Sequence, residues 1–301
     1  MANDYKYRAD PIGQLVPPET IEGPPTPEQL DAWTKRALGV QSVVALPVAT
    51  DGEYRRSHLA AALVERGRAG AAPTLVAEEA AFALASTKTP LKVSLPSASA
   101  VVKAVGGDPE TTAAAAIKSL QAEAAALIAA GVAYVQFNAS AYDDLLSEDL
   151  GAKLATYAAW DHALISGIER PSNVRIGLRF GRNGAAPVWT ASSAVETMFA
   201  LPADRLLIDF GLDPKDFSVL SLVPAKADVV LGLIDNQCKT RQSTDGLLSA
   251  IDAAAKIIDG TRLALSPRGG FSAKNGVTWA QQRNALEQLV EAATSWWGFS
   301  L

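Results

Sequence analysis

The sequence is poor in the residues that most often bind transition metals. It contains one cysteine, Cys238, and two histidines, His58 and His162, among 301 residues. A single cysteine excludes an internal disulfide bond. These residues do not have the spacing of a zinc motif, so we expect neither a bound metal nor another cofactor. Cys238 has no histidine beside it in the sequence, which favours an inert residue over a catalytic nucleophile.

The chain also lacks an excess of basic residues and a long hydrophobic run. Its formal net charge is −5, whereas nucleic-acid binding needs a basic surface. The longest apolar run, 122–135, is rich in alanine and too short to span a bilayer, and the N-terminus has no signal-peptide core. We therefore expect a cytoplasmic protein that binds neither nucleic acid nor membranes. Its expected macromolecular partner is a second copy of the chain, in a homodimer.

Short apolar runs alternate with longer helical stretches along most of the chain. Thr26, Asp108 and Thr278 are typical helix N-caps, and a proline follows each of the first two at the first helical position. Eight strands alternating with helices, in a chain that is 49% hydrophobic, predict a closed (β/α)8 TIM barrel. The expected strands are Ser42–Val48, Thr74–Ala77, Leu91–Leu95, Tyr134–Phe137, Val174–Leu178, Leu206–Phe210, Asp228–Ile234 and Leu263–Leu265.

The first 25 residues differ from the rest because they are rich in proline. Proline fixes φ and removes a hydrogen-bond donor, so residues 1–25 are expected to form an extended arm. The chain shows no further change of composition and no linker. We therefore predict one barrel domain over residues 26–301, with the arm packed against it.

The catalytic residues of such a barrel lie at the carboxyl ends of its strands. Asp209 ends a buried apolar strand and is the strongest candidate acid or base, although a structural pair with an arginine is the alternative. Asp51 and Glu53 follow the first expected strand and are further candidates, with capping of the next helix as the other role for Asp51.

Arginines and amides make up most of the remaining side chains at the strand ends. Arg179, Arg182 and Arg268 come from two strands that end at the same face, and a guanidinium binds carboxylate, sulfonate or phosphate through paired hydrogen bonds. The pattern therefore indicates a small anionic substrate. The expected substrate-binding residues are Arg179, Arg182, Arg268, Gln136, Asn138, Asp235, Gln237, Arg55 and His58.

Several segments together resemble a known family. They include Thr50-Asp51-Gly52-Glu53 followed by Arg55-Arg56, Leu95-Pro96-Ser97, and the most specific stretch, 229–271. In this order they resemble the C-terminal domain of the cobalamin-independent methionine synthases, within the superfamily that also contains uroporphyrinogen decarboxylase. The resemblance implies the TIM-barrel fold from nearly end to end.

The resemblance also implies a zinc site, which this sequence does not retain. Family members bind zinc with a histidine, two cysteines and a glutamate. Those positions fall on Arg179, Gly181, Gly269 and Asp209, of which only Asp209 is a residue type that binds zinc. The zinc-dependent alkylation of a thiol is therefore not expected here.

Three functions remain open after the loss of the zinc ligands. The first is a metal-independent lyase or decarboxylase that acts on a small carboxylated substrate, with aromatic acids among the candidates, because uroporphyrinogen decarboxylase uses arginines and an aspartate without a metal. The second is a methyl or alkyl transferase that needs no zinc. The third is a pseudoenzyme that binds an anion without turning it over. A buried acid with a strongly shifted pKa would favour an enzyme.

Overall fold

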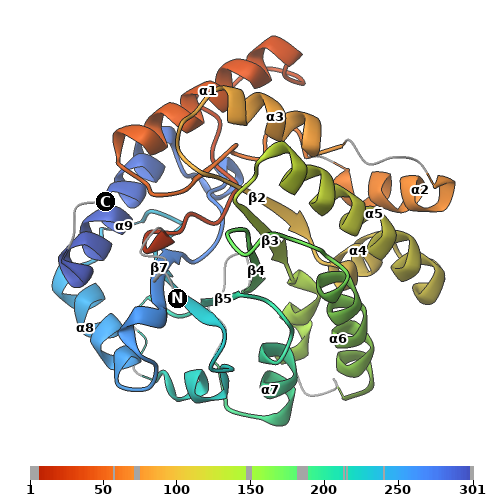
Figure 1. Cartoon of the computed structure of the whole chain (residues 1–301). Coiled ribbons are helices and arrows are strands. Elements are labelled where there is room, and N and C mark those ends of the chain that lie inside the picture. The colour runs from red at the N-terminus through yellow and green to blue at the C-terminus, as the bar shows by residue number, and fades with distance from the viewer. Residues whose placement is uncertain are drawn as a thin grey trace.

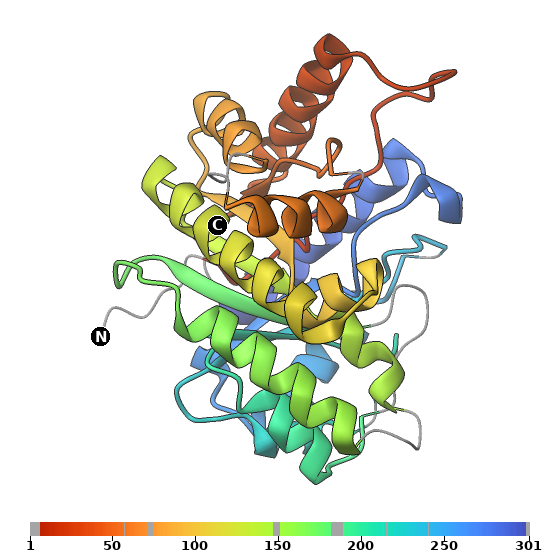
Figure 2. The same cartoon turned by 90° about the vertical axis from the view of Figure 1, so that its right-hand side faces the viewer.

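The computed structural model describes residues 7–56, 58–70, 75–146, 151–181, 189–212, 214, 216–239 and 241–298. Its strands form one parallel sheet in chain order, curled into the centre of the molecule with the helices outside (Figures 1 and 2). The (β/α)8 TIM-barrel expectation is thereby confirmed as the fold class. The strands are β1 (Ala49–Thr50), β2 (Leu91–Pro96), β3 (Tyr134–Asn138), β4 (Arg175–Phe180), β5 (Arg205–Asp209), β6 (Asp228–Ile234) and β7 (Leu263–Pro267).

The helices begin largely where their capping residues predict. Thr26 and Thr278 form capping boxes with Gln29 and Gln281, and Asp108 accepts a hydrogen bond from Thr111 N. The helices are α1 (Pro27–Val43), α2 (Leu59–Ala69), α3 (Ala77–Ala85), α4 (Ala98–Val105), α5 (Pro109–Ala130), α6 (Gly151–Ser166), α7 (Ser193–Phe199), α8 (Thr244–Ala255) and α9 (Trp279–Trp297).

Two of the eight expected strands are wrong. In the segment 42–48, Ser42 and Val43 complete α1, and β1 begins only at Ala49. In the segment 74–77, Leu75 and Val76 form a turn and Ala77 starts α3. Both segments are apolar because they are packed against the core, and a short apolar run does not distinguish a strand from a buried turn or helix end.

The N-terminal arm occupies the gap between β7 and β1. Ala9 forms a parallel bridge with Leu265, and Gln14 forms a parallel bridge with Gly52, just after β1. Backbone hydrogen bonds join Asp10 N to Leu265 O (2.9 Å) and Leu15 N to Gly52 O (3.1 Å). The arm therefore closes the barrel as its eighth parallel segment, which its prolines alone do not predict.

A buried cluster of charges anchors the arm inside the barrel. Asp10 pairs with Lys92 of β2, whose ammonium group also donates to Pro11 O at 2.7 Å. Arg205 of β5 lies 3.7 Å from the second Asp10 oxygen. The side chains of Asp10 and Lys92 are fully buried, and burial lowers the pKa of Lys92 to about 8 although Asp10 opposes this shift.

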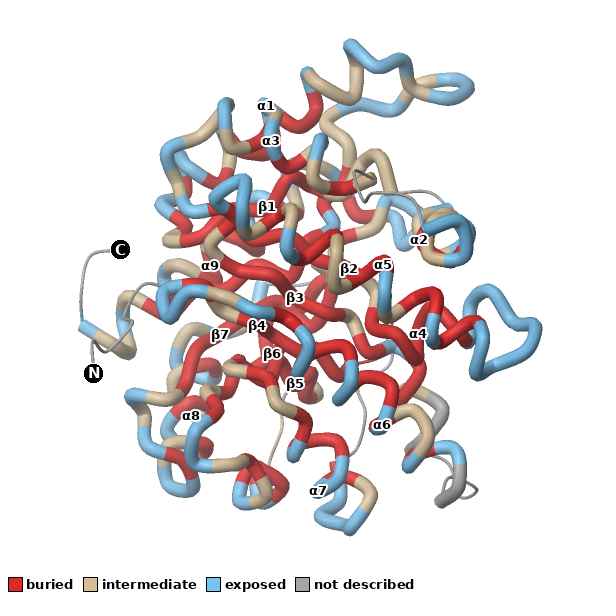
Figure 3. Tube along the Cα trace, turned by 45° about the vertical axis from the view of Figure 1, so that its right-hand side comes forward, coloured by how far each residue is buried: buried red, intermediate tan, exposed pale blue. Residues whose placement is uncertain are grey.

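Burial follows the barrel layout, with exposed positions confined mainly to helix surfaces and loops (Figure 3). Among the described residues, α5 is the helix long and apolar enough to cross a membrane by composition. It packs against α2, α4 and α6 as an outer helix of the barrel. Alternate residues of each strand face the barrel interior, so polar residues at the strand ends converge on the mouth.

Candidate active site

An ion pair between β4 and β5 lies at the centre of the mouth. Arg179 Nη2 donates to Asp209 Oδ2 and also to the backbone carbonyl of Arg268, at 3.2 Å. The exposed fractions are 6% for Arg179, 1% for Asp209 and 8% for Arg268, so all three are withdrawn from solvent. The structure thus brings together the proposed acid and two of the three proposed anion-binding arginines.

The environment of Asp209 favours its protonated form. Desolvation raises the pKa of this carboxyl group to about 7, and the charges of Arg179 and then Arg268 offset only part of the shift. A carboxyl group of this kind can both give and take a proton near neutral pH. Asp209 is therefore suited to acid–base chemistry even though it also has the structural partner expected for the alternative role.

Two glycines make room for the Asp209 side chain. A Cβ atom at Gly181 would overlap the Asp209 carboxylate, and one at Gly232 would lie 2.7 Å from Asp209 Oδ1. On the other side, Trp189 Nε1 donates to the backbone carbonyl of Asp209 at 2.7 Å. The two glycines therefore give the carboxylate its space, and Trp189 fixes the Asp209 backbone.

Replacing Gly181 with alanine is expected to destabilise the fold by about 1–3 kcal/mol, the usual cost of overpacking a buried site. The free energy of unfolding in denaturant measures this effect. Gly39→Ala is the control, because Gly39 lies in α1 and, apart from its own helix backbone and chain neighbours, no described atom lies within 4 Å of the added methyl group. That variant should be as stable as the wild type or slightly more stable. Equal stabilities of the two variants would contradict this packing around Asp209.

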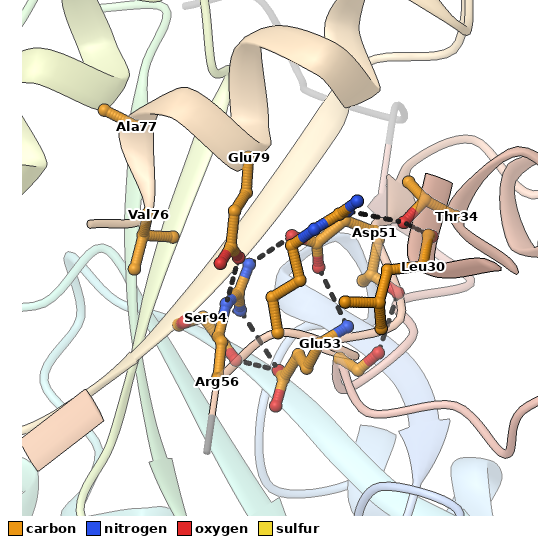
Figure 4. Close-up of polar contacts among 12 residues, drawn as sticks. Leu30, Thr34, Asp51, Glu53, Arg56, Val76, Ala77, Glu79 and Ser94 are labelled. Atoms are coloured by element: carbon orange, nitrogen blue, oxygen red, sulfur yellow. Dashed lines mark hydrogen bonds and ion pairs between the residues drawn. The ribbon is translucent and has the colours of Figure 1, made fainter. Parts of the chain in front are cut away.

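A second cluster of charges surrounds Arg56 beside the mouth (Figure 4). Arg56 pairs with Asp51, lies 3.6 Å from both Glu53 and Glu79, and donates to Ser94 O at 2.8 Å. Burial raises the pKa of Glu53 and raises that of Glu79 to about 7, against the attraction of Arg56 in each case. The positive charge of Arg56 thus lies within ion-pair distance of three carboxylates.

The loop after β1 holds Glu53 in an uncommon conformation. The φ angle of Glu53 is 62°, and its backbone N–H donates to Asp51 Oδ1 at 3.1 Å. The carboxylate accepts a hydrogen bond from Ser94 Oγ. Asp51 therefore shapes the loop and pairs with Arg56, and it does not cap α2, which begins at Leu59 after His58.

A pocket of about 490 Å³ opens between the arm and this loop. Its polar wall includes Glu53 and Arg56, and Trp33 and Tyr54 provide an aromatic wall, with their rings 5.7 Å apart. The remaining lining residues are Gln14, Leu15, Pro17, Gly52 and Lys274. A small ligand can therefore reach Glu53 from solvent.

Other expected site residues have mainly structural contacts. Gln136 Nε2 donates to Ile12 O of the arm (3.0 Å) and to Asn138 Oδ1 (2.7 Å). Both amides therefore lie in the barrel interior, toward the carboxyl end of β3. Asp235 accepts hydrogen bonds from the backbone N–H groups of Gln237 and Lys239 and so orders the loop after β6.

Two expected site residues are directed away from this cluster. Arg55 pairs with Asp31 of α1, and His58 is exposed at the start of α2. Both follow β1 closely in sequence, but the loop turns them toward the outer helices. Arg182 lies outside the described residues.

The positions of the family's zinc ligands do not form a zinc site here. The Arg179 guanidinium lies at one position, and the Asp209 carboxylate occupies the space that a side chain at Gly181 would need. Among the residues that the structure describes, no group of three or more His, Cys, Asp or Glu side chains could hold a metal ion. The residues present therefore do not fit zinc, and no reaction step is assigned to it.

Sequence reasoning missed the supporting residues of the mouth. Arg56, Ser94 and Glu79 were not among the expected site residues, although Arg56 stands in the Thr50–Arg56 segment that carries the resemblance. Glu79 lies in the first turn of α3, and an acidic residue there is ordinarily interpreted as a solvent-exposed charge on the helix surface. Ser94 could have been found from the period of two along a strand, because it lies two residues after Lys92 of β2 and therefore faces the barrel interior as Lys92 does.

Comparisons with known proteins agree with this architecture. A protein of Bacillus subtilis, the uncharacterized protein YxjH, is 24% identical over 97% of this chain and 95% of its own length. A putative vitamin-B12 independent methionine synthase from Listeria monocytogenes has a similar structure, with a TM-score of 0.76, 22% identity, and coverage of 97% and 98% of the two chains.

Two more solved structures share the fold over nearly their whole length. A B12-independent methionine synthase from a Shewanella species, in complex with selenomethionine, has a TM-score of 0.73 at 16% identity, covering 96% of this chain and 97% of its own. A methyltransferase from Methanosarcina mazei has a TM-score of 0.56 at 13% identity, covering 96% and 95%. At these identities the likeness shows the fold alone.

The family model described as "Cobalamin-independent synthase, Catalytic domain" matches residues 78–295. The match spans most of the chain and includes Arg179, Asp209 and Arg268, whereas the arm and the Asp51–Arg56 loop precede it. The chain therefore belongs to the cobalamin-independent synthase family, through its catalytic domain.

Proposed function

We propose that the protein is a metal-independent enzyme that binds a small carboxylated molecule at the mouth of the barrel and moves a proton there through Asp209. The observation that carries this proposal is the Asp209 carboxyl group itself. It is buried, bonded to Arg179, and has a pKa raised to about 7 by desolvation. A titratable group of this kind is more typical of catalytic sites than of pure binding sites.

The arrangement suits a lyase. Arg179 and Arg268 would hold the substrate carboxylate, and the ionised Asp209 would take a proton from the adjacent carbon. Guanidinium donors stabilise the enolate-like charge that then develops on the carboxylate. As the C–H bond breaks, its electron pair forms a carbon–carbon double bond, and the leaving group on the next carbon departs with the pair of its own bond.

Binding of simple carboxylates tests the first part of the proposal. Carboxylic acids should stabilise the protein in a thermal-shift screen, by about 2.7 kcal/mol at a hundred times the dissociation constant, whereas the matching primary amides should not. Arg179→Lys keeps the charge but loses the planar fork, and it should weaken carboxylate binding roughly tenfold. Arg283→Lys, in the exposed i,i+4 pair with Glu287, is the control. Equal binding of acids and amides would reject the proposal.

A methyl or alkyl transferase without zinc is the second candidate. Family membership favours it, because similar structures are described as methionine synthases and a methyltransferase. Product analysis by NMR separates the candidates: a lyase produces an unsaturated or shortened acid from one substrate, whereas a transferase needs a methyl or alkyl donor. Binding of acids with no turnover of either kind would favour the non-catalytic alternative.

A further inference from the structure

The pocket between the arm and the loop after β1 has room for a small ligand. Its volume of about 490 Å³ is typical of small-molecule sites. Leu15 and Pro17 of the arm supply apolar walls, and Trp33 of α1 and Tyr54 of the loop supply aromatic ones. The lining residues do not include the ion pair at the centre of the mouth, so an inference about this pocket is independent of the proposed function.

The two aromatic residues offer ring surface to the pocket. Their rings meet edge to face, with centroids 5.7 Å apart and an angle of 72° between the planes. Trp33 Nε1 donates to Glu19 Oε1 at 3.0 Å, and the Tyr54 hydroxyl donates to Val16 O at 3.2 Å. The polar groups of both rings are therefore already bonded, and the apolar ring surface that remains favours contact with another aromatic ring.

Glu53 supplies a hydrogen-bond acceptor in the same pocket. Its side chain is 19% exposed, its Oε1 atom accepts from Ser94 Oγ, and no described residue donates to its Oε2 atom. Its φ angle of 62° is uncommon for a residue with a side chain, and such backbone conformations concentrate where ligands bind. One carboxylate oxygen is consequently available to a donor on a ligand.

The charges around Glu53 favour a neutral donor over a cation. Arg56 pairs with Asp51 and lies 3.6 Å from both Glu53 and Glu79. Burial raises the pKa of Glu53, and raises that of Glu79 to about 7, so the cluster carries less negative charge than three ionised carboxylates would. Lys274 also lines the pocket and would repel a cation.

We propose that this pocket binds a neutral aromatic molecule whose ring lies against Trp33 and Tyr54 and whose O–H or N–H group donates to Glu53. Phenols and indoles belong to this class. Such a ligand contacts the arm and the loop after β1 together. The same two walls are joined by the hydrogen bond from Leu15 N to Gly52 O, so the bound ligand stabilises the docking of the arm.

Titrations of the wild-type protein followed by ligand-observed NMR test the two halves of this proposal. Phenol should bind about tenfold more tightly than anisole, which has the same ring and oxygen but no hydrogen to donate to Glu53. Phenol should also bind about fivefold more tightly than cyclohexanol, which keeps the donor but lacks the aromatic ring. The first comparison tests the carboxylate, and the second tests the aromatic walls.

Substitution of Glu53 tests the acceptor. Glu53→Met should reduce the preference for phenol over anisole to about twofold or less, because methionine has a similar length but accepts hydrogen bonds only weakly. Glu79→Met is the matched control, since it removes a carboxylate that lies at the same 3.6 Å from Arg56 but does not line the pocket. It should keep the full preference.

Substitution of Tyr54 tests the aromatic wall. Tyr54→Leu should weaken the binding of phenol and anisole alike, by about fivefold, and leave the preference between them unchanged. Tyr157→Leu is the matched control, because Tyr157 is also half-buried with its ring 5.7 Å from that of a tryptophan, Trp160, but lies in α6 away from the pocket. It should bind both ligands as the wild type does.

Hydrogen exchange shows whether phenol binds at this place. Exchange at the Leu15 N–H group should slow about threefold at twice the dissociation constant, since the ligand-free fraction then falls to a third. Binding without this protection would place the ligand elsewhere and reject the proposal. Equal affinities for phenol and anisole, or tighter binding of benzylammonium than of phenol, would also overturn it. These wild-type measurements decide the matter even if a variant does not fold.

Discussion

Replacing Asp209 with asparagine is expected to slow proton exchange at the substrate by a factor of about 100 to 10,000, the usual contribution of a positioned acid or base. Asparagine has nearly the same shape but cannot take a proton. The measurement is deuterium incorporation from D2O at the carbon next to the carboxylate, followed by NMR for the acid that binds most tightly. It does not require the complete reaction to be known.

The pH dependence of exchange gives a second readout of the same variant. Because the pKa of Asp209 is raised to about 7, the rate should increase with pH through about 7 and then level off as the carboxylate becomes fully ionised. The free energy of unfolding should change in the opposite direction and decrease as the pH rises. The unfolded carboxyl ionises near pH 4, so its contribution to stability is complete below that pH and is lost as the pH rises through about 7. Asp209→Asn should remove both dependences.

Asp161→Asn is the control for this substitution. Asp161 is also a buried carboxylate with a pKa raised by desolvation, but it accepts hydrogen bonds from Ser99 between α4 and α6, behind the sheet. It should lower stability without changing the exchange rate per folded molecule. An Asp209→Asn protein that exchanges within about threefold of the wild-type rate would show that Asp209 is not the proton-transfer group.

Replacing Asp10 with asparagine is expected to destabilise the protein by about 3–5 kcal/mol, because it leaves a buried ammonium group without its counter-ion. Asp10 and Lys92 are both fully buried, and Arg205 adds a second cation at 3.7 Å. The loss should be visible as a lower free energy of unfolding in urea at pH 7. Since Asp10 lies in the arm, hydrogen exchange at the Leu265 N–H group, which donates to Arg8 O, should become faster.

The pH dependence distinguishes loss of this ion pair from a general packing defect. The pKa of Lys92 is lowered to about 8, and it should fall further without Asp10. An unfolded lysine keeps its proton up to about pH 10, so stability rises with pH wherever the unfolded chain binds more protons. The variant should therefore regain stability between pH 7 and about 10. Asp31→Asn, in the part-exposed pair with Arg55, should cost at most about 1 kcal/mol.

Most of the barrel could be predicted from local pattern. The strands β2 to β7 are buried apolar segments of the expected length, and their predicted positions agree with the structure to within about two residues. The helix starts at Thr26, Asp108 and Thr278 depend on hydrogen bonds within four residues and were equally readable. The role of the arm in closing the barrel was not, because the bridge from Ala9 to Leu265 connects residues about 250 positions apart and Pro11 lacks the N–H group of an ordinary strand.

The candidate site was also predictable only in part, because many of its contacts join residues that are far apart in the sequence. Placing Arg179, Asp209 and Arg268 at strand ends was enough to expect them at one face. The register of β5 with β6 was needed to show that Asp209 lies beside Gly232, whose missing side chain makes room for the carboxylate. The direction of Arg55 toward Asp31 depends on how the loop after β1 meets α1, which a sequence pattern does not encode.

The sequence by itself determined the fold class, the family and the loss of the zinc ligands, because these depend on the order of residue types along the chain. Only the tertiary structure decided that the arm closes the barrel and that Arg179 pairs with Asp209. Those properties arise from contacts across the barrel, where burial raises the energetic cost of every unpaired charge and hydrogen-bonding group.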